Sequence, residues 1–256
     1  MLQFLSNKSR AKTRRASYVH ALLNVALPIA VLVLVSARLP YLAVTLVLLA
    51  KWRVLAVQPR YWLVNMRSNS VDLIVNISFV LLMHSTPNFI VQCMFTVGFI
   101  IWLVFIKPRS EIGWVSIQAA TAQVLGLVAL GDLISNGSIN VWPEFINISL
   151  VFLISVASAR HFLSSYGDRY LLVLSLSWGL FMAELAWILN HWLILYERYV
   201  SHLVLLGTVF GYVVMRLYAK SNDEKLGSKE MRILAVFCCV ILLVVVLLSN
   251  WRRSLY

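Results

Sequence analysis

Long runs of apolar residues, separated by short clusters of charged and polar residues, dominate the pattern of this chain. A bilayer core of roughly 30 Å is crossed by about 20 apolar helical residues. Measured against that length, the pattern predicts an all-α polytopic membrane protein with about nine spans. The third span is short unless it begins within 67–70. The expected ranges are 18–36, 41–57, 71–85, 88–106, 112–134, 144–160, 170–192, 199–218 and 233–250.

Composition supports the membrane assignment. The chain is 61% hydrophobic and 12% charged, and its mean hydropathy is +0.84. Soluble domains carry about 25% charged residues, so a soluble globular fold is excluded. No connecting segment is long enough to form a separate domain. Residues 1–256 are therefore expected to form a single integral membrane domain, with a basic cytoplasmic leader at 1–17 and a charged cytoplasmic loop at 219–232.

The net charge of +12 predicts topology rather than a nucleic-acid partner, because the basic residues are scattered at the ends of the apolar runs. If the N-terminus is cytoplasmic, nine spans place 18 of the 22 Lys and Arg residues inside and four outside. This asymmetry favours a cytoplasmic N-terminus and an outer C-terminus. An even number of spans, which would bring the terminal "WRRSLY" inside, is the main alternative. The first span also has features of a cleavable signal peptide, although a retained anchor is favoured.

The segment 51–67 mixes aromatic rings with cations, a combination that suits an anionic headgroup layer. It therefore predicts contact with membrane lipids, while ordinary anchoring at the interface is the competing and broader interpretation. The residues concerned are Lys51, Trp52, Arg53, Arg60, Trp62 and Arg67.

The seventh span carries the most unusual polar residues. Helical positions seven apart lie nearly in line, so Ser177, Glu184 and His191 are expected to form one stripe with Tyr170. A carboxylate within a span is costly unless it faces protein or water, is protonated, or meets a cation. Glu184 is therefore expected to lie on a protein-facing surface in the outer half of the bilayer.

Three histidines, His84, His191 and His202, are expected near the outer ends of their spans. Together with Glu184 they suggest a hypothetical metal or proton site, and paired histidines raise haem ligation as a further hypothesis. The favoured interpretation is that these histidines hydrogen-bond to water or backbone at the interface. No cofactor is predicted, and the metal assignment is left open.

Other polar positions favour helix packing. "GTVFG", from Gly207 to Gly211, is a GxxxG pattern that permits close helix contact. Gln118 and Gln123 accompany small residues on the fifth span, where amides can bond across helices. A cluster of such residues around a central cavity would instead indicate a path for a solute.

Four short segments resemble a group of multi-pass membrane proteins from small-genome bacteria to which no activity is assigned. They are "KWR" at 51–53, "NSVDLIV" at 69–75, "SARHFL" at 158–163 and "ILNHWLILY" at 188–196. The resemblance implies a bacterial plasma membrane and transfers no functional site.

The leading functional hypothesis is transport or permeation of a small solute or ion, with Glu184 as a buried coupling residue. The alternative is a subunit or scaffold of a membrane complex, in contact with partner helices or a second copy of the chain. A membrane-embedded enzyme acting on lipid or envelope precursors comes third. The sequence contains no HExxH, GxSxG, P-loop or GxGxxG motif, so enzymatic activity is not favoured.

Overall fold

The computed structural model describes residues 22–52, 58–135, 143–192 and 202–222, with a few positions between 232 and 243. Of these residues, 89% are helical and none lies in a strand. The all-α architecture predicted from the sequence is therefore confirmed for the described part of the chain.

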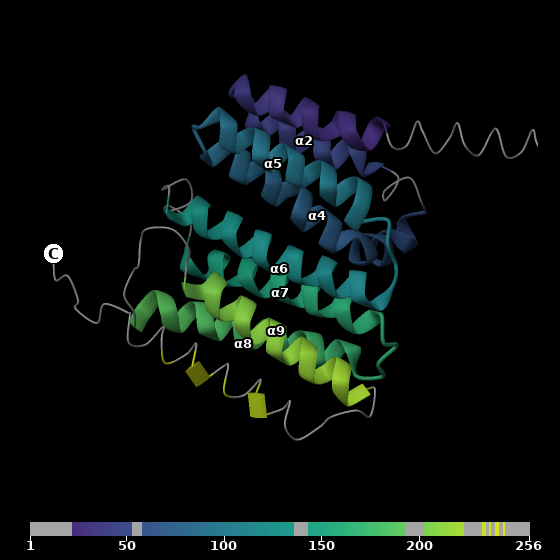
Figure 1. Cartoon of the computed structure of the whole chain (residues 1–256), viewed down its shortest axis with the longest axis vertical. Coiled ribbons are helices and arrows are strands. Elements are labelled where there is room, and N and C mark those ends of the chain that lie inside the picture. Colours follow the sequence, from purple (N-terminus) through teal and green to yellow (C-terminus); the bar gives the residue numbers. More distant parts are fainter. Residues whose placement is uncertain are drawn as a thin grey trace, which may run out of the picture. The chain divides into compact units, whose positions relative to one another are not determined.

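Most described helices coincide with the predicted apolar runs (Figure 1). The third is longer than expected, because α4 begins at Trp62 rather than at residue 71 and includes the polar residues before its apolar core. The fourth ends in a π-helix, labelled η2, which closes the run in a wider turn. The elements are Leu22–Ser36, α2 (Pro40–Ala50), η1 (Pro59–Tyr61), α4 (Trp62–Ser85), α5 (Phe89–Ile101), η2 (Trp102–Ile106), α6 (Ile112–Ser135), α7 (Glu144–Ser164), α8 (Leu171–Trp192) and α9 (His202–Asn222).

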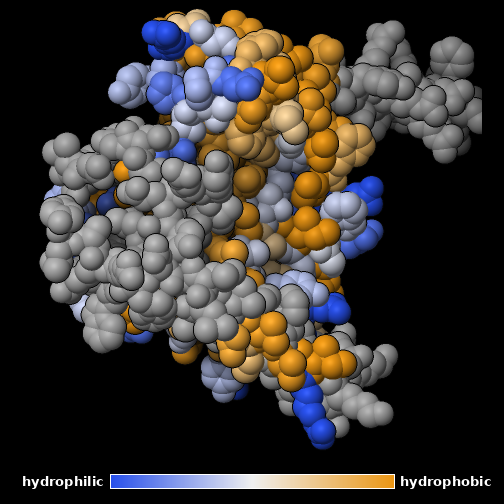
Figure 2. Space-filling view, turned by 60° about the vertical axis from the view of Figure 1, so that its left-hand side comes forward, coloured by the Kyte–Doolittle hydropathy of each residue, from blue (hydrophilic) through white to orange (hydrophobic). Residues whose placement is uncertain are grey.

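Five of these helical stretches are long and apolar enough to cross a bilayer: Val64–Ser85, Phe89–Ile106, Ile112–Ile134, Glu144–Ser164 and Leu171–Leu189. Three further apolar helices are shorter. Many large apolar side chains are exposed, and they form much of the described surface in Figure 2. Exposure on this scale is explained when lipid is the solvent. The chain is therefore a membrane-embedded helical protein, while the nine-span count and the orientation stay predictions.

The chain divides into two compact units, each with its own packing. The first contains Met1–Met66 and Phe79–Ser110, and the second contains Arg67–Ser78 and Glu111–Tyr256. Whether they act as the expected single membrane domain also stays a prediction.

Within the first unit, Gln92 bonds across helices as its position in an apolar run predicts. Its Nε2 atom donates to the carbonyl oxygens of Met83 at 3.1 Å and Thr86 at 2.8 Å. These acceptors lie at the end of α4, where backbone carbonyls have no partner within the helix. The next helix is capped by Asn88, whose side chain accepts from the backbone N–H of Ile90 at 2.9 Å. These polar side chains bond to backbone groups at the helix ends, which would be costly to leave unpaired in an apolar environment.

In the second unit, four helices form a closed ring. α6 packs against α7 and α9, and α8 packs against the same two helices. One apolar cluster lies at the end of the ring that contains Leu127, Val151 and Met182. A second cluster lies at the other end and contains Phe162 and Leu163. The ring is thus filled with side chains at both ends.

Small residues set the closeness of these helices. A Cβ atom placed on Gly179 of α8 would lie 2.3 Å from Cγ2 of Val156 and 3.0 Å from the ring of Phe152, both on α7. A Cβ on Gly207 would lie 2.4 Å from Cε of Met182, so the predicted GxxxG pattern does mark a close contact between α8 and α9. The two contacts differ in how they would respond to an added methyl group. The flexible Met182 side chain can move away from Gly207, whereas Val156 is stiff about its first torsion and cannot move away from Gly179 in the same way.

We predict that Gly179→Ala lowers the free energy of unfolding by about 1–3 kcal/mol, because the added methyl group forces α7 and α8 apart. Denaturant titration in mixed micelles measures this change. Gly113→Ala is the control, since a Cβ at Gly113 meets nothing within 4 Å. Equal stability of the two variants would show that α7 and α8 pack less closely than described.

Candidate binding cavity between α6, α7, α8 and α9

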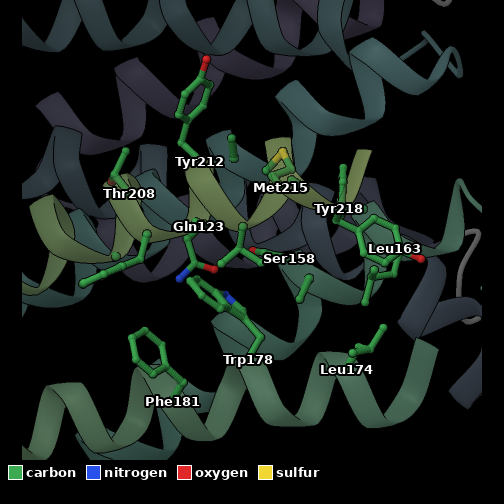
Figure 3. A pocket seen from close by; sticks show the side chains of 18 of the residues that line it. Gln123, Ser158, Leu163, Leu174, Trp178, Phe181, Thr208, Tyr212, Met215 and Tyr218 are labelled. Carbon is green, nitrogen blue, oxygen red and sulfur yellow. The ribbon is translucent and has the colours of Figure 1, made fainter. Parts of the chain in front are cut away.

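The ring of α6 to α9 encloses a cavity of about 610 Å³ between its two apolar ends. All four helices contribute lining residues, among them Ala120, Ser158, Trp178 and Tyr212 (Figure 3). A volume of this size falls within the range of about 300–1,000 Å³ typical of sites for small molecules. The cavity is thus large enough to be a candidate binding site.

The lining of the cavity is unevenly exposed. Lining residues on α6 and α7, such as Gln123 and Ser158, are buried. Those on α8 and α9 are more exposed, including Phe181 at 39% and Tyr212 at 51%. The exposed part of the lining therefore belongs to the two helices α8 and α9.

The described lining is almost entirely apolar and contains no charged side chain. Its buried polar members are Gln123, which is 6% exposed, and Ser158, which is 3% exposed. Both lie near Trp178 in the middle of the close-up in Figure 3. An apolar cavity with a few placed polar groups is the usual design of a site that fixes the orientation of a ligand.

The amide of Gln123 performs two roles. Its Nε2 atom donates a hydrogen bond of 3.0 Å to Oγ of Ser155, which is fully buried on α7. Its Oε1 atom is buried and has no hydrogen-bond partner among the described residues, and neither does Oγ of Ser158. A buried polar atom without a partner costs about 1–3 kcal/mol. One end of the amide thus joins α6 to α7, and the other end is left without a partner among the described residues.

A second cross-helix bond strengthens the same pair of helices. Nε2 of His161 donates to Oε1 of Gln118 at 2.9 Å, since an amide oxygen can only accept. The prediction that Gln118 and Gln123 connect helices is therefore confirmed. The additional feature is the cavity beside Gln123, which the sequence pattern named only as an alternative.

One end of the cavity is closed by three aromatic rings, those of Phe162, Tyr166 and Tyr218. Their centroids lie 5.2 to 5.8 Å apart in tilted and edge-to-face arrangements, which favour such clusters. The Tyr218 hydroxyl donates a hydrogen bond to Oδ2 of Asp168, and the Tyr170 backbone N–H donates to Oδ1 at 2.8 Å. The loop between α7 and α8 is thereby held to α9.

These hydrogen bonds, that of Tyr218 first and that of Tyr170 second, lower the pKa of the Asp168 carboxyl below its ordinary value. Both donors stabilise the ionised form. The loop also requires Gly167, whose φ of +65° lies in the left-handed region that disfavours other residues.

The structure corrects the expected placement of Glu184. Ser177 and Glu184 do share one face of α8, with Tyr170 in the turn just before the helix, but all three residues are exposed. The buried face of the helix carries Met182 and Ala186 instead. The Glu184 side chain is therefore exposed rather than buried, and it does not line the cavity, whereas Ser177 does. The role of Glu184 as a coupling residue stays a prediction.

The proposed grouping of His84, His191 and His202 stays a prediction. His84 is exposed in the last turn of α4, within the first unit. The side chains of His191 and His202 lie outside the described residues. Within the described part of the chain, no group of three or more His, Cys, Asp or Glu residues could hold a metal ion. The metal, proton and haem hypotheses thus gain no support from the described geometry.

The lipid-interface candidates lie around the start of α4. Trp52 is 62% exposed and Trp62 is 41% exposed. The guanidinium carbon of Arg60 lies 4.6 Å from the centre of the Tyr61 ring, and Arg67 is exposed. Lys51 directly follows α2 and is half-buried, and Arg53 lies outside the described residues. Their contact with lipid headgroups stays a prediction.

Ser158 is the site residue that the sequence did not single out. Its signal was present as a second serine three positions after Ser155, on the same face of an otherwise apolar helix. On the neighbouring helix α6, Gln123 stands among small residues. Polar residues on both helices thus indicated where α6 and α7 contact each other.

Comparison with protein-family models, curated proteins and solved structures finds no match to this chain. The functional argument therefore depends on the geometry of the cavity and on the composition of its lining.

The lowered pKa of Asp168 leads to a prediction about pH. A carboxyl whose folded-state pKa is depressed adds stability above its unfolded value, near 3.8, and loses it as the pH falls through the folded value. We therefore expect wild type to be more stable than Tyr218→Phe at neutral pH, with the difference shrinking below about pH 4. Thermal unfolding in detergent at several pH values measures this difference.

The control for that experiment is Tyr212→Phe, a matched change on the same helix at an exposed position. It should produce no pH-dependent difference. A stability difference between wild type and Tyr218→Phe that stays constant down to pH 2 would contradict a bond to the ionised carboxylate.

Proposed function

We propose that this chain is a membrane protein that binds a mainly apolar small molecule inside the ring of α6 to α9. The observation that carries the proposal is the apolar cavity of about 610 Å³ with the unpartnered polar atoms of Gln123 and Ser158 on its wall. Random packing defects in a helical core are seldom of this size, because protein interiors contain few voids larger than a water molecule.

The exposed part of the lining supports the same proposal. A molecule dissolved in the bilayer reaches the side of the ring without crossing water, and the exposed apolar side chains of α8 and α9 form its route. Transport of a small solute, the leading hypothesis from the sequence, is retained as a proposal. The solute class is narrowed to uncharged and largely apolar molecules. An inorganic ion fits this lining poorly, because burial of an unpaired charge is expensive.

As a second candidate, we propose that α8 contacts a partner helix in a membrane complex. Glu184 favours this, since its side chain is exposed among exposed apolar residues such as Leu180 and Ile188. A carboxylate at the centre of a span costs about 2.5–3.5 kcal/mol on insertion scales unless it is paired or protonated. A partner that supplies a hydrogen-bond donor would offset this cost.

We also propose nine spans with the N-terminus in the cytoplasm, in a bacterial plasma membrane. The support is the distribution of Lys and Arg, with 18 of 22 on one side, and the resemblance of four sequence segments to multi-pass bacterial proteins.

The binding proposal predicts that filling the cavity blocks binding. Ala120→Phe and Ala159→Phe each place a ring into the lining and should reduce competable labelling by a dodecyl diazirine photoprobe several-fold. Labelling is mapped by mass spectrometry on the α8 and α9 peptides, with excess dodecane as competitor. Leu153→Phe is the control, because this residue lies on the same helix as Ala159 and is 58% exposed.

Glu184→Gln separates the two functional candidates. It should leave the labelling unchanged, because Glu184 lies outside the lining. If the native complex has a lower mass in this variant alone, the result supports the proposal that α8 contacts a partner helix. Unchanged labelling of both Phe variants would refute binding in the cavity, and reduced labelling of Glu184→Gln would restore the role first expected for that residue.

The proposed topology predicts which positions a membrane-impermeant maleimide reaches in intact cells, after Cys93, Cys238 and Cys239 are replaced. Pro87→Cys, before α5, should react from outside, and Ser110→Cys, after it, should be protected. Both residues are exposed, so access depends on the side of the membrane. Reaction at Tyr256→Cys would support the ninth span. The opposite labelling of the first two positions would reverse the orientation.

A further inference from the structure

We propose that the molecule bound in the cavity carries a hydroxyl group on an apolar body, and that this hydroxyl is held between Gln123 and Ser158. The inference rests on the proposed function, because it names the chemistry of the ligand for the same cavity. The observations that carry it are the two buried polar atoms without partners, Oε1 of Gln123 and Oγ of Ser158, on one apolar wall.

The hydrogen-bonding capacity of the two side chains defines the complementary group. The carbonyl oxygen of Gln123 can only accept, and the Nε2 end of the amide donates to Ser155. The Ser158 hydroxyl can both donate and accept. A ligand hydroxyl can donate to Gln123 and at the same time accept from Ser158. One such group therefore satisfies both side chains.

Other neutral head groups satisfy only part of this arrangement. An ether or ester oxygen accepts from Ser158 but leaves Oε1 of Gln123 without a donor. A hydrocarbon leaves both atoms unpaired. Since an unmade buried hydrogen bond is penalised more than a made one is rewarded, the site should discriminate against these molecules.

Charged head groups are disfavoured by the rest of the lining. No Lys, Arg, His, Asp or Glu is among the described residues that line the cavity. The nearest histidine on α7, His161, lies outside the lining and is bonded to Gln118. A carboxylate or an ammonium would enter without a counter-charge, which an apolar cavity does not favour.

The rest of the ligand is defined by the shape and composition of the lining. Trp178, Phe181 and Phe210 provide flat apolar surfaces, with ring centroids 5.4 and 5.6 Å apart in successive pairs. Gly207 and Gly211 of α9 also line the cavity, and there Met182 and Trp178 approach the α9 backbone closely. An alkyl or isoprenoid body with a terminal or internal hydroxyl matches this surface.

The test uses the full chain in lipid nanodiscs and tritiated 1-dodecanol as the probe. Unlabelled 1-dodecanol, dodecyl methyl ether, dodecane and dodecanoate compete at equal mole fractions in the membrane. We expect dodecanol to bind about tenfold more tightly than the ether or the alkane, the effect of one buried hydrogen bond. Dodecanoate should compete no better than the alkane.

Variants assign the effect to the two side chains. Ser158→Ala should weaken dodecanol binding about three- to tenfold and leave dodecane binding unchanged. Ser158→Thr, which retains the hydroxyl, should bind as wild type does. Ser175→Ala is the matched control, because this serine is 1% exposed on α8, bonds to the carbonyl of Leu172 in its own helix and does not line the cavity.

Each contrary result has a distinct meaning. Saturable binding with equal affinity for dodecanol and dodecane overturns the hydroxyl inference and leaves the binding function intact. Tighter binding of dodecanoate overturns it in favour of an anion. The absence of saturable binding by every competitor overturns both this inference and the proposed function.

Discussion

The hydrogen bond from Nε2 of Gln123 to Oγ of Ser155 determines how the α6 to α9 ring is used. Inside a bilayer, polar groups must find partners within the protein, because neither lipid nor water is available to them. This bond joins α6 to α7 and fixes the direction of the amide. The carbonyl end then lies on the cavity wall, where its need for a donor becomes the basis of recognition. In the proposed function, Gln123 therefore contributes both to the cohesion of the helices and, with Ser158, to the selection of the ligand.

The helices themselves were largely predictable, because the apolar runs match the length of a bilayer crossing. Residues 112–134 and 144–160 lie within α6 and α7, and the structure extends each by a few residues. The start of α4 was not predicted, since the polar residues of the segment 65–70 interrupt the apolar pattern and yet continue the helix. Helix propensity and lipid burial are different constraints, and hydropathy reports only the second.

The candidate site was less predictable, for a physical reason. In a soluble protein the apolar face of a helix is the packed face, but lipid is as apolar as a protein core. The stripe through Glu184 was assigned to the wrong environment, because the exposed face of α8 is itself apolar and includes Leu180 and Phe181. Gln123 was visible as a polar residue among small ones. Its cavity depends on how four helices meet, which no single helix encodes.

The proposed entry of the ligand from the bilayer, beside α8 and α9, changes what affinity means for this protein. A ligand that enters from the bilayer is first concentrated there, and about 0.8 kcal/mol per methylene favours that partition. An apparent affinity referred to water would therefore rise with chain length even if the cavity were indifferent to it. The intrinsic selectivity of the site is the difference in affinity that is measured when ligand concentrations are expressed per membrane volume. Chain length then determines the concentration of the ligand in the bilayer, and the polar groups of Gln123 and Ser158 determine which ligand is bound.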